Sequence, residues 1–161
     1  MFYGEYKRHL DEKGRVMIPS ELRSLIPESI YITYGFDQCL MLLLPSTYQQ
    51  ILDVIDKRSV YDPLARNLRR TFYGKSRLQT IDASTRIRVP AELLEGKNIQ
   101  TGSDIMLVGN GAYIEIWSME EWQKNNAMLS NAEFTQERFS NFDLVLDNPI
   151  PPNLNPSQLT E

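Results

Sequence analysis

The chain has 161 residues, of which 42% are hydrophobic and 10% aromatic, enough for the core of one domain or of two small fused modules. A single cysteine, Cys39, excludes a disulfide within the chain, and the single histidine, His9, leaves too few ligands for a zinc site of the usual kind. The net charge is −4 but is unevenly distributed, because residues 57–88 carry nine cations and two acids, whereas residues 91–161 carry three cations and eleven acids. A polyanion would meet this local charge rather than the total.

Several classes of protein are not expected. The first residues lack the pattern of a signal peptide, and no apolar run approaches the ~18 residues that a membrane helix needs. The sequence contains no phosphate-binding glycine loop and no Gly-x-Ser-x-Gly elbow. We therefore expect a soluble, cytoplasmic protein that is not an enzyme and uses no cofactor, metal, membrane or small-molecule ligand.

The first elements form a unit of strand, turn, strand and helical turn. Residues 2–10 alternate as in a strand, and Asp11–Gly14 has turn chemistry, since Asp can accept from its own backbone and Gly tolerates a positive φ. Residues 16–18 indicate a second strand, which Pro19 ends because proline has no N–H. A short helix is expected at 20–23.

Two more strands and a helix complete this unit. Residues 29–34 are β-branched and aromatic, and residues 39–44 have no polar face and should be buried, Cys39 included. Ser46 is expected to cap the following helix, with Gln49 closing a capping box. The apolar stripe of this helix is formed by Tyr48, Ile51, Leu52 and Ile55.

A linker helix is predicted between the two halves of the chain. Asp62 suits its cap, Pro63 its first position and Gly74 its exit. Its basic side is either a solvated face or a contact surface, and both alternatives raise the local positive potential; the side consists of Arg66, Arg69 and Arg70.

The first motif then returns. Asp82-x-x-x-Arg86-x-x-x-Pro90 repeats Asp11-x-x-x-Arg15-x-x-x-Pro19 at a distance of 71 positions. Strands at 104–109 and 112–117 correspond to the later strands of the first half, and Ser118 with Glu121 forms a capping box. The expected organisation is repeat 1 at 5–57, a basic linker helix at 58–75, repeat 2 at 76–128, and a segment at 129–161 with a short helix (Phe134, Phe139) and a Pro- and Asn-rich tail.

Each β-β-α-β-β repeat is too small to bury much surface alone. Two repeats can interleave their strands into one closed barrel that hides the strand edges. The expected fold class is thus α+β, mainly β: a pseudo-dimer of two interleaved repeats with flanking helices. Its internal two-fold would bring the Asp11–Arg15 and Asp82–Arg86 turns to one face.

The doubled motif, together with Phe2-x-Gly4-Glu5-Tyr6 and Glu115-Ile-Trp117, resembles the MraZ family of the AbrB/SpoVT-like swapped-hairpin group. The resemblance covers about residues 1–128. It implies a nucleoid-associated transcriptional regulator made of two AbrB-like repeats, which forms ring-like oligomers and binds double-stranded DNA. The sites would be short repeated sequences upstream of its own division and cell-wall gene cluster.

Family DNA contacts fall on the Asp-x-x-x-Arg motif, so the resemblance implies DNA contacts by Arg15 and Arg86, with Lys13 as a neighbour. We expect these arginines to reach base edges, where arginine on guanine gives ~1–3 kcal/mol of discrimination. Phosphate contacts are expected from Lys7, Lys13 and Arg88. Asp11 and Asp82 are interpreted as structural acids that orient the motif.

One residue departs from the family pattern. Thr85 stands where the family has glycine, and since a β-branched residue resists positive φ, the second turn is expected to have another shape. Two other functions remain open. One is an oligomeric protein-interaction module, in which the arginines only close ion pairs. The other is an AbrB-type antitoxin, whose C-terminal segment would fold on a toxin.

Overall fold

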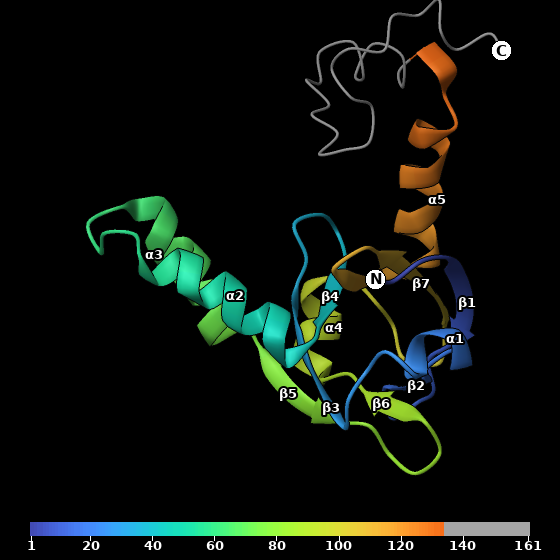
Figure 1. Cartoon of the computed structure of the whole chain (residues 1–161). Coiled ribbons are helices and arrows are strands. Elements are labelled where there is room, and N and C mark those ends of the chain that lie inside the picture. The colour runs from blue at the N-terminus through green and yellow to red at the C-terminus, as the bar shows by residue number, and fades with distance from the viewer. Residues whose placement is uncertain (134–161) are drawn as a thin grey trace, which may run out of the picture. The chain divides into compact units, whose positions relative to one another are not determined.

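The computed structural model describes residues 1–133, which form an α+β fold in which strands predominate, as expected (Figure 1). Similar runs of elements follow one another along the chain. The first run consists of β1 (Glu5–His9), β2 (Arg15–Met17), α1 (Ser20–Arg23), β3 (Ser29–Tyr34), β4 (Leu40–Leu43) and α2 (Pro45–Asp56).

A short helical connection leads from the first run to the second. It consists of α3 (Pro63–Arg69) and the π-helical turn η1 (Arg70–Gly74). The second run consists of β5 (Arg77–Thr80), β6 (Arg86–Arg88), α4 (Ala91–Gly96), β7 (Asp104–Asn110), β8 (Tyr113–Ser118) and α5 (Met119–Leu129). The order of elements is therefore the same in both halves.

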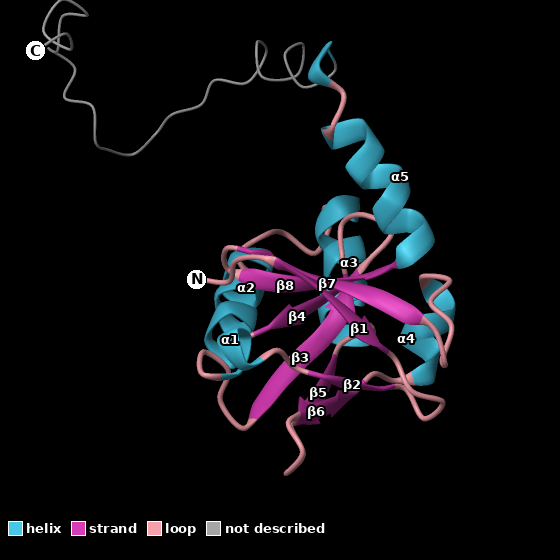
Figure 2. Ribbon diagram, turned by 90° about the vertical axis from the view of Figure 1, so that its right-hand side faces the viewer, coloured by secondary structure: helices cyan, strands magenta, loops and turns pink. Residues whose placement is uncertain are grey.

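The strands of the two halves pair with one another. Six strands form one antiparallel sheet in the order β1-β7-β8-β4-β3-β5, while β2 and β6 form a separate two-stranded ribbon (Figure 2). The first strand of each half pairs with the third strand of the other, as β1 with β7 and β5 with β3. The fourth strands, β4 and β8, pair with each other at the middle of the sheet.

The strands do not close into the barrel that we expected. In the described part of the chain, β1 and β5 are outer strands of the sheet, each paired with a single strand. The physical reason lies in the turns after these strands, which direct the chain into β2 and β6. Among residues 1–133 these two strands pair only with each other, so they do not close the sheet edges.

The main core lies between one face of the sheet and a layer made of the ribbon, α1 and α4. Val16 and Ile87 are the buried side chains of the ribbon, and Leu22 and Leu93 are those of the two short helices. They pack into one cluster with the inward side chains of the sheet, among them Ile30, Ile32, Leu40, Leu42, Ile105, Leu107, Ile114 and Ile116. This burial fixes the ribbon on the sheet by one face only.

Helix α2 and η1 cover part of the opposite face of the sheet. All four residues of β4 are buried, as expected for a strand without a polar face. The ring of Tyr48 stacks on Tyr31 with 3.8 Å between ring centroids, and its hydroxyl donates to the carbonyl of Phe72. The apolar stripe of α2 is confirmed by the burial of Tyr48, Leu52 and Ile55.

The start of α2 differs from our expectation. The helix begins at Pro45 after Leu44, and no side chain in the described part of the chain caps it, so the predicted capping by Ser46 is wrong. Proline fixes φ near the helical value and has no N–H to satisfy, which suits the first helical position. Gln49 instead donates to Asp53 one turn further along the helix (2.9 Å).

The arginines of the linker hold the end of α2 rather than forming a purely solvated face. Arg69 donates through Nη2 to the carbonyls of Arg58 (2.9 Å) and Ile55 (3.3 Å), and its Nε lies 3.5 Å from Asp56. Arg66 donates to the carbonyl of Val60 (3.0 Å). The predicted start of α3 is confirmed, since Asp62 accepts from the N–H of Leu64 and Pro63 is the first helical residue.

Helix α5 begins where predicted, with Ser118 accepting from the N–H of Glu121 (3.1 Å). Its first turns belong to the compact unit Met1–Gln123, in which Trp122 meets Trp117 edge to face over Cys39. Residues from Lys124 onward belong to a second unit, where Ser130 donates to the carbonyl of Asn126 (2.9 Å). Phe134, Phe139 and the Pro- and Asn-rich tail lie outside the described residues.

Candidate nucleic-acid interface

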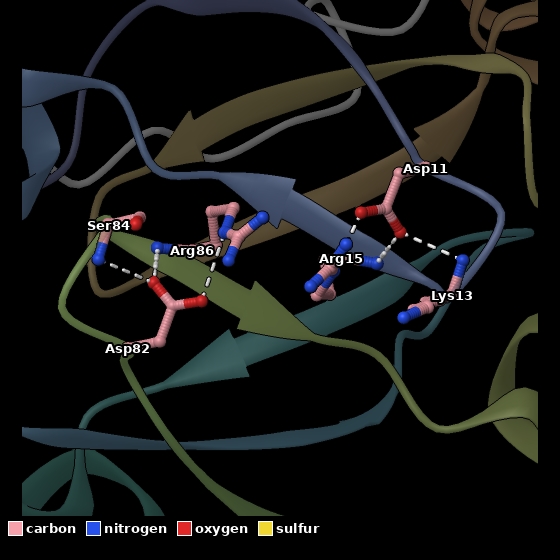
Figure 3. Close-up of polar contacts among 6 residues, drawn as sticks. All are labelled: Asp11, Lys13, Arg15, Asp82, Ser84 and Arg86. Carbon is pink, nitrogen blue, oxygen red and sulfur yellow. Dashed lines mark hydrogen bonds and ion pairs between the residues drawn. The ribbon is translucent and has the colours of Figure 1, made fainter.

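The first repeated turn is organised by the carboxylate of Asp11. Its Oδ1 accepts from the backbone N–H groups of Lys13 (2.9 Å) and Arg15 (2.8 Å), and its Oδ2 accepts from Nε of Arg15 (2.7 Å). Gly14 takes a positive φ of 76° at the tight point of the turn. Through these hydrogen bonds the acid shapes the turn and holds the arginine (Figure 3).

The second turn has the same hydrogen bonds. Asp82 accepts from the N–H groups of Ser84 (2.9 Å) and Arg86 (2.9 Å) and from Nε of Arg86 (3.0 Å). Thr85 takes a φ of 62°, close to that of Gly14 in the first turn. The expectation of a different shape is therefore wrong, because the three hydrogen bonds to the Asp82 carboxylate and the bond from the N–H of Thr85 to the carbonyl of Asp82 (3.0 Å) outweigh the conformational preference of a β-branched residue.

Both turns also bind the opposite strand of the ribbon. The carbonyl of Gly14 accepts from the N–H of Val89 (2.7 Å), and the carbonyl of Thr85 accepts from the N–H of Ile18 (2.9 Å). Each turn is therefore anchored on the other repeat. Figure 3 shows the two turns at opposite ends of the ribbon.

The register of the ribbon gathers arginines on its exposed face. Arg15 lies opposite Arg88 and Met17 lies opposite Arg86, while Val16 and Ile87 between them point into the core. Directly opposed residues share one face of an antiparallel pair. We call this outward face, formed by Arg15, Met17, Arg86 and Arg88, the ribbon face.

The acids of the turns are held in the charged form. The backbone N–H of Arg15 is the largest cause that lowers the pKa of Asp11 to about 2, and the guanidinium of Arg15 adds to it. The backbone N–H of Arg86 likewise lowers the pKa of Asp82. Each arginine uses Nε for its acid, and among the described residues its two Nη groups have no hydrogen-bond partner.

The structure separates Lys7 from the other predicted contacts. Its Nζ lies 3.6 Å from Asp104 Oδ2, and Nδ1 of His9 lies 3.1 Å from Oδ1 of the same acid. Because successive side chains alternate along β1, Lys7 and His9 share one side of the strand, and Arg8 lies on the other.

Arg8 was not among the contact residues predicted from the sequence. This residue lines a groove with Met17 and Thr85 next to the ribbon face, and Arg23 of α1 lines the same groove. The signal in the sequence was present but ambiguous, since only the alternation of β1 relative to the core distinguishes Arg8 from its neighbour Lys7.

Comparison with known proteins places the chain among relatives. The family model described as "MraZ protein, putative antitoxin-like" matches residues 1–71 and again residues 72–144. The protein of Dictyoglomus thermophilum named "Transcriptional regulator MraZ" is 36% identical over 126 residues, which cover 78% of this chain and 85% of the relative. The chain belongs to the MraZ family.

A second relative extends the match. The protein of the same name from Heliobacterium modesticaldum is 32% identical over 145 residues, 89% of this chain and 100% of the relative. The two consecutive matches of the MraZ model confirm the internal repeat. These MraZ relatives are named for transcriptional regulation, which is not an enzymatic class.

Two further findings concern residues 1–133 of this MraZ family member. No helix there is both long and apolar enough to cross a membrane. No group of three or more His, Cys, Asp or Glu side chains in that part of the chain is placed to hold a metal ion.

Proposed function

We propose that the chain is a sequence-specific, double-stranded DNA-binding transcriptional regulator that reads DNA with the ribbon face. The observation that carries this proposal is the register of β2 and β6, which sets Arg15, Arg86 and Arg88 side by side on the exposed face. The side chains of Arg15 and Arg86 are 32% and 33% exposed, and Arg88 is exposed. A guanidinium group matches the two acceptors on the major-groove edge of guanine. The names of the MraZ relatives support the same function.

The roles of the residues follow from their contacts. Arg15 and Arg86 reach base edges through their Nη groups, while Asp11 and Asp82 hold Nε and fix the direction of the side chain. Lys13, exposed at the first turn, contacts phosphate, as does Arg88. Lys7 stays a proposed phosphate contact, although its Nζ lies 3.6 Å from Asp104, on the other side of β1 from Arg8. The protein acts as a regulator without catalysis and works in the cytoplasm on the nucleoid.

The repeat boundaries belong to the same proposal. Repeat 1 (5–57) and repeat 2 (76–128) are swapped-hairpin units, joined by the basic linker (58–75) and followed by the segment 129–161. Support comes from the exchanged pairing of β1 with β7 and β5 with β3. The target is the promoter of the chain's own division and cell-wall gene cluster, where several subunits would bind several short sites.

Several subunits would form a ring-like homo-oligomer. Support comes from an apolar groove between α2 and η1, lined among others by Phe36, Ile51, Val54, Leu68 and Phe72. Val54 and Phe36 are exposed by 61% and 72%, and exposed apolar patches of this kind mark protein contacts. Several ring subunits on one DNA would multiply weak individual contacts.

This groove also favours the alternative function, an oligomeric interaction module. In that case the arginines would only form ion pairs with the acids of the turns, and the protein would not bind DNA. Retention on heparin or random DNA that falls with rising salt would favour the regulator, because counterion release accompanies phosphate binding.

A mobility-shift titration tests the proposal. The probe is the DNA upstream of the chain's own gene, with scrambled DNA as competitor, and the variants are Arg15→Ala and Arg86→Ala. Arg70→Ala serves as the matched control, since Arg70 is a linker cation whose side chain contacts Asn67. We expect the two ribbon variants to lose ~1–3 kcal/mol of discrimination and the control to behave as wild type. Unchanged selectivity in both ribbon variants would refute the assignment.

A further inference from the structure

The ribbon face is not symmetric, although the backbone around it repeats. Arg88 and Met17 occupy equivalent positions 71 residues apart, so one end of the face carries the opposed pair Arg15 and Arg88 while the other carries Arg86 and Met17. Like charges directly opposite each other destabilise an antiparallel pair. Asp11 neutralises Arg15, but Arg88 has no ion pair among residues 1–133. Binding of an anion by the ribbon itself is therefore favoured at this end.

The Arg86 end has its extra cations beside the ribbon instead. The groove next to Met17 and Thr85 is lined by Arg8 from β1 and Arg23 from α1, together with Ser24 and with Ser20, whose hydroxyl donates to Glu21 (3.2 Å). Arg8 donates one Nη to the carbonyl of Lys7 (2.8 Å), and Arg23 donates one Nη to the carbonyl of Ile26 (2.7 Å). These bonds fix the two guanidinium groups, and neither forms an ion pair among the described residues.

The equivalent positions at the Arg15 end cannot form such a groove. Gln79 stands 71 positions after Arg8, and Leu94, which is buried, stands 71 positions after Arg23. Glu95 stands where Ser24 stands in the first repeat, so an acid replaces a hydroxyl. The two ends of one pseudo-symmetric surface therefore differ in the position of their positive charge.

We propose that the groove around Arg8 and Arg23 binds a phosphate of the DNA backbone beside the Arg86 end only, so that each ribbon binds its DNA site in one fixed direction. The proposal rests on the function proposed above and adds to it the residues that set the direction. Two guanidinium groups held by backbone carbonyls, with the hydroxyl of Ser24 nearby, provide donors that a phosphate accepts. The Arg15 end instead has its phosphate contact on the ribbon itself, at Arg88.

The experiment compares full-length variants by fluorescence anisotropy over a series of salt concentrations. The duplexes are the DNA upstream of the chain's own gene and a scrambled duplex of the same composition. The variants are Arg8→Gln, the double variant Arg8→Gln/Arg23→Gln, and Arg88→Met, with Arg70→Gln as a linker control. Thermal unfolding of each variant verifies folding, and Arg8→Gln alone keeps the test valid if loss of the Arg23 contact destabilises α1.

Phosphate binding predicts a defined pattern. The slope of log affinity against log salt should fall by about one for Arg8→Gln and by about two for the double variant, equally on both duplexes. Arg88→Met removes a phosphate contact at the Arg15 end and should also lower the slope by about one on both duplexes, whereas Arg70→Gln should leave the slope unchanged. In ethylation interference, the double variant should lose sensitive phosphates on one flank of each recognised site only.

Two results would overturn the inference while leaving the proposed function intact: a wild-type salt slope in both groove variants, or loss of sensitive phosphates on both flanks. Wild-type protein that binds neither duplex, or binds without salt dependence, would overturn the proposed function itself and this inference with it.

Discussion

Thr85 has the backbone conformation that glycine has in the first repeat, with φ of 62° against 76° for Gly14. A β-branched residue with this positive φ stores strain of about 1–3 kcal/mol. Glycine would remove the strain, but the larger conformational entropy that glycine loses on folding would offset part of this gain. We expect Thr85→Gly to stabilise the protein by about 1 kcal/mol, measured by urea unfolding. Gly14→Ala is the opposite control and should destabilise it, since the new Cβ would lie 2.9 Å from the carbonyl of Val89. A less stable Thr85→Gly protein would show that the side chain has a favourable contact.

The carboxylate of Asp11 should make stability depend on acid pH. Its pKa is lowered from 3.8 to about 2 in the folded chain, chiefly by the backbone N–H of Arg15, so the charged form favours folding. This contribution is complete above pH ~4 and is lost as the pH falls through 2. The denaturant midpoints of unfolding of wild type and Asp11→Asn should therefore differ by a constant amount near neutral pH. This difference should become smaller below pH ~4. A difference that stays constant down to pH ~3 would contradict the assignment, and Asp82→Asn should show the same trend.

At the scale of elements, the ribbon is held by its buried face, which leaves the other face available. Ile87 is fully buried in the main core, whereas Met17 on the ribbon face is 54% exposed. We expect Ile87→Ala to destabilise the fold by about 2–5 kcal/mol in denaturant unfolding, and Met17→Ala to change it by less than ~0.5 kcal/mol. Similar losses in both variants would mean that the ribbon face itself packs against protein.

At the scale of the whole molecule, assembly should depend on the apolar groove between α2 and η1. A carboxylate at Val54 would be desolvated by a docked second copy, so Val54→Asp should lower the mass measured by light scattering at a concentration where wild type assembles. Val60→Asp is the matched control, because Val60 is equally exposed at 63% but does not line the groove. Equal masses for wild type and Val54→Asp would place the contact elsewhere.

Much of the fold could be predicted because its signals are local. The Asp turns, the ends of strands at Pro19 and Pro90, the cap at Asp62 and the burial of β4 depend on residues close together in the chain. The predicted start of α2 was wrong. Ser46 could have capped the helix with its side chain, but the helix begins at Pro45, because the fixed φ of proline favours the first helical position.

The sequence alone determined the repeat, the class of fold and the arginines of the turns, because identical motifs at a constant spacing impose identical local hydrogen bonds. Only the tertiary structure decided which residues share a face. The pairing of Arg15 with Arg88 and of Met17 with Arg86, and the groove that joins Arg8 to Arg23, bring together residues from different strands and helices. Strand register between distant segments depends on core packing as a whole, and a shift by one residue would bury the ribbon arginines.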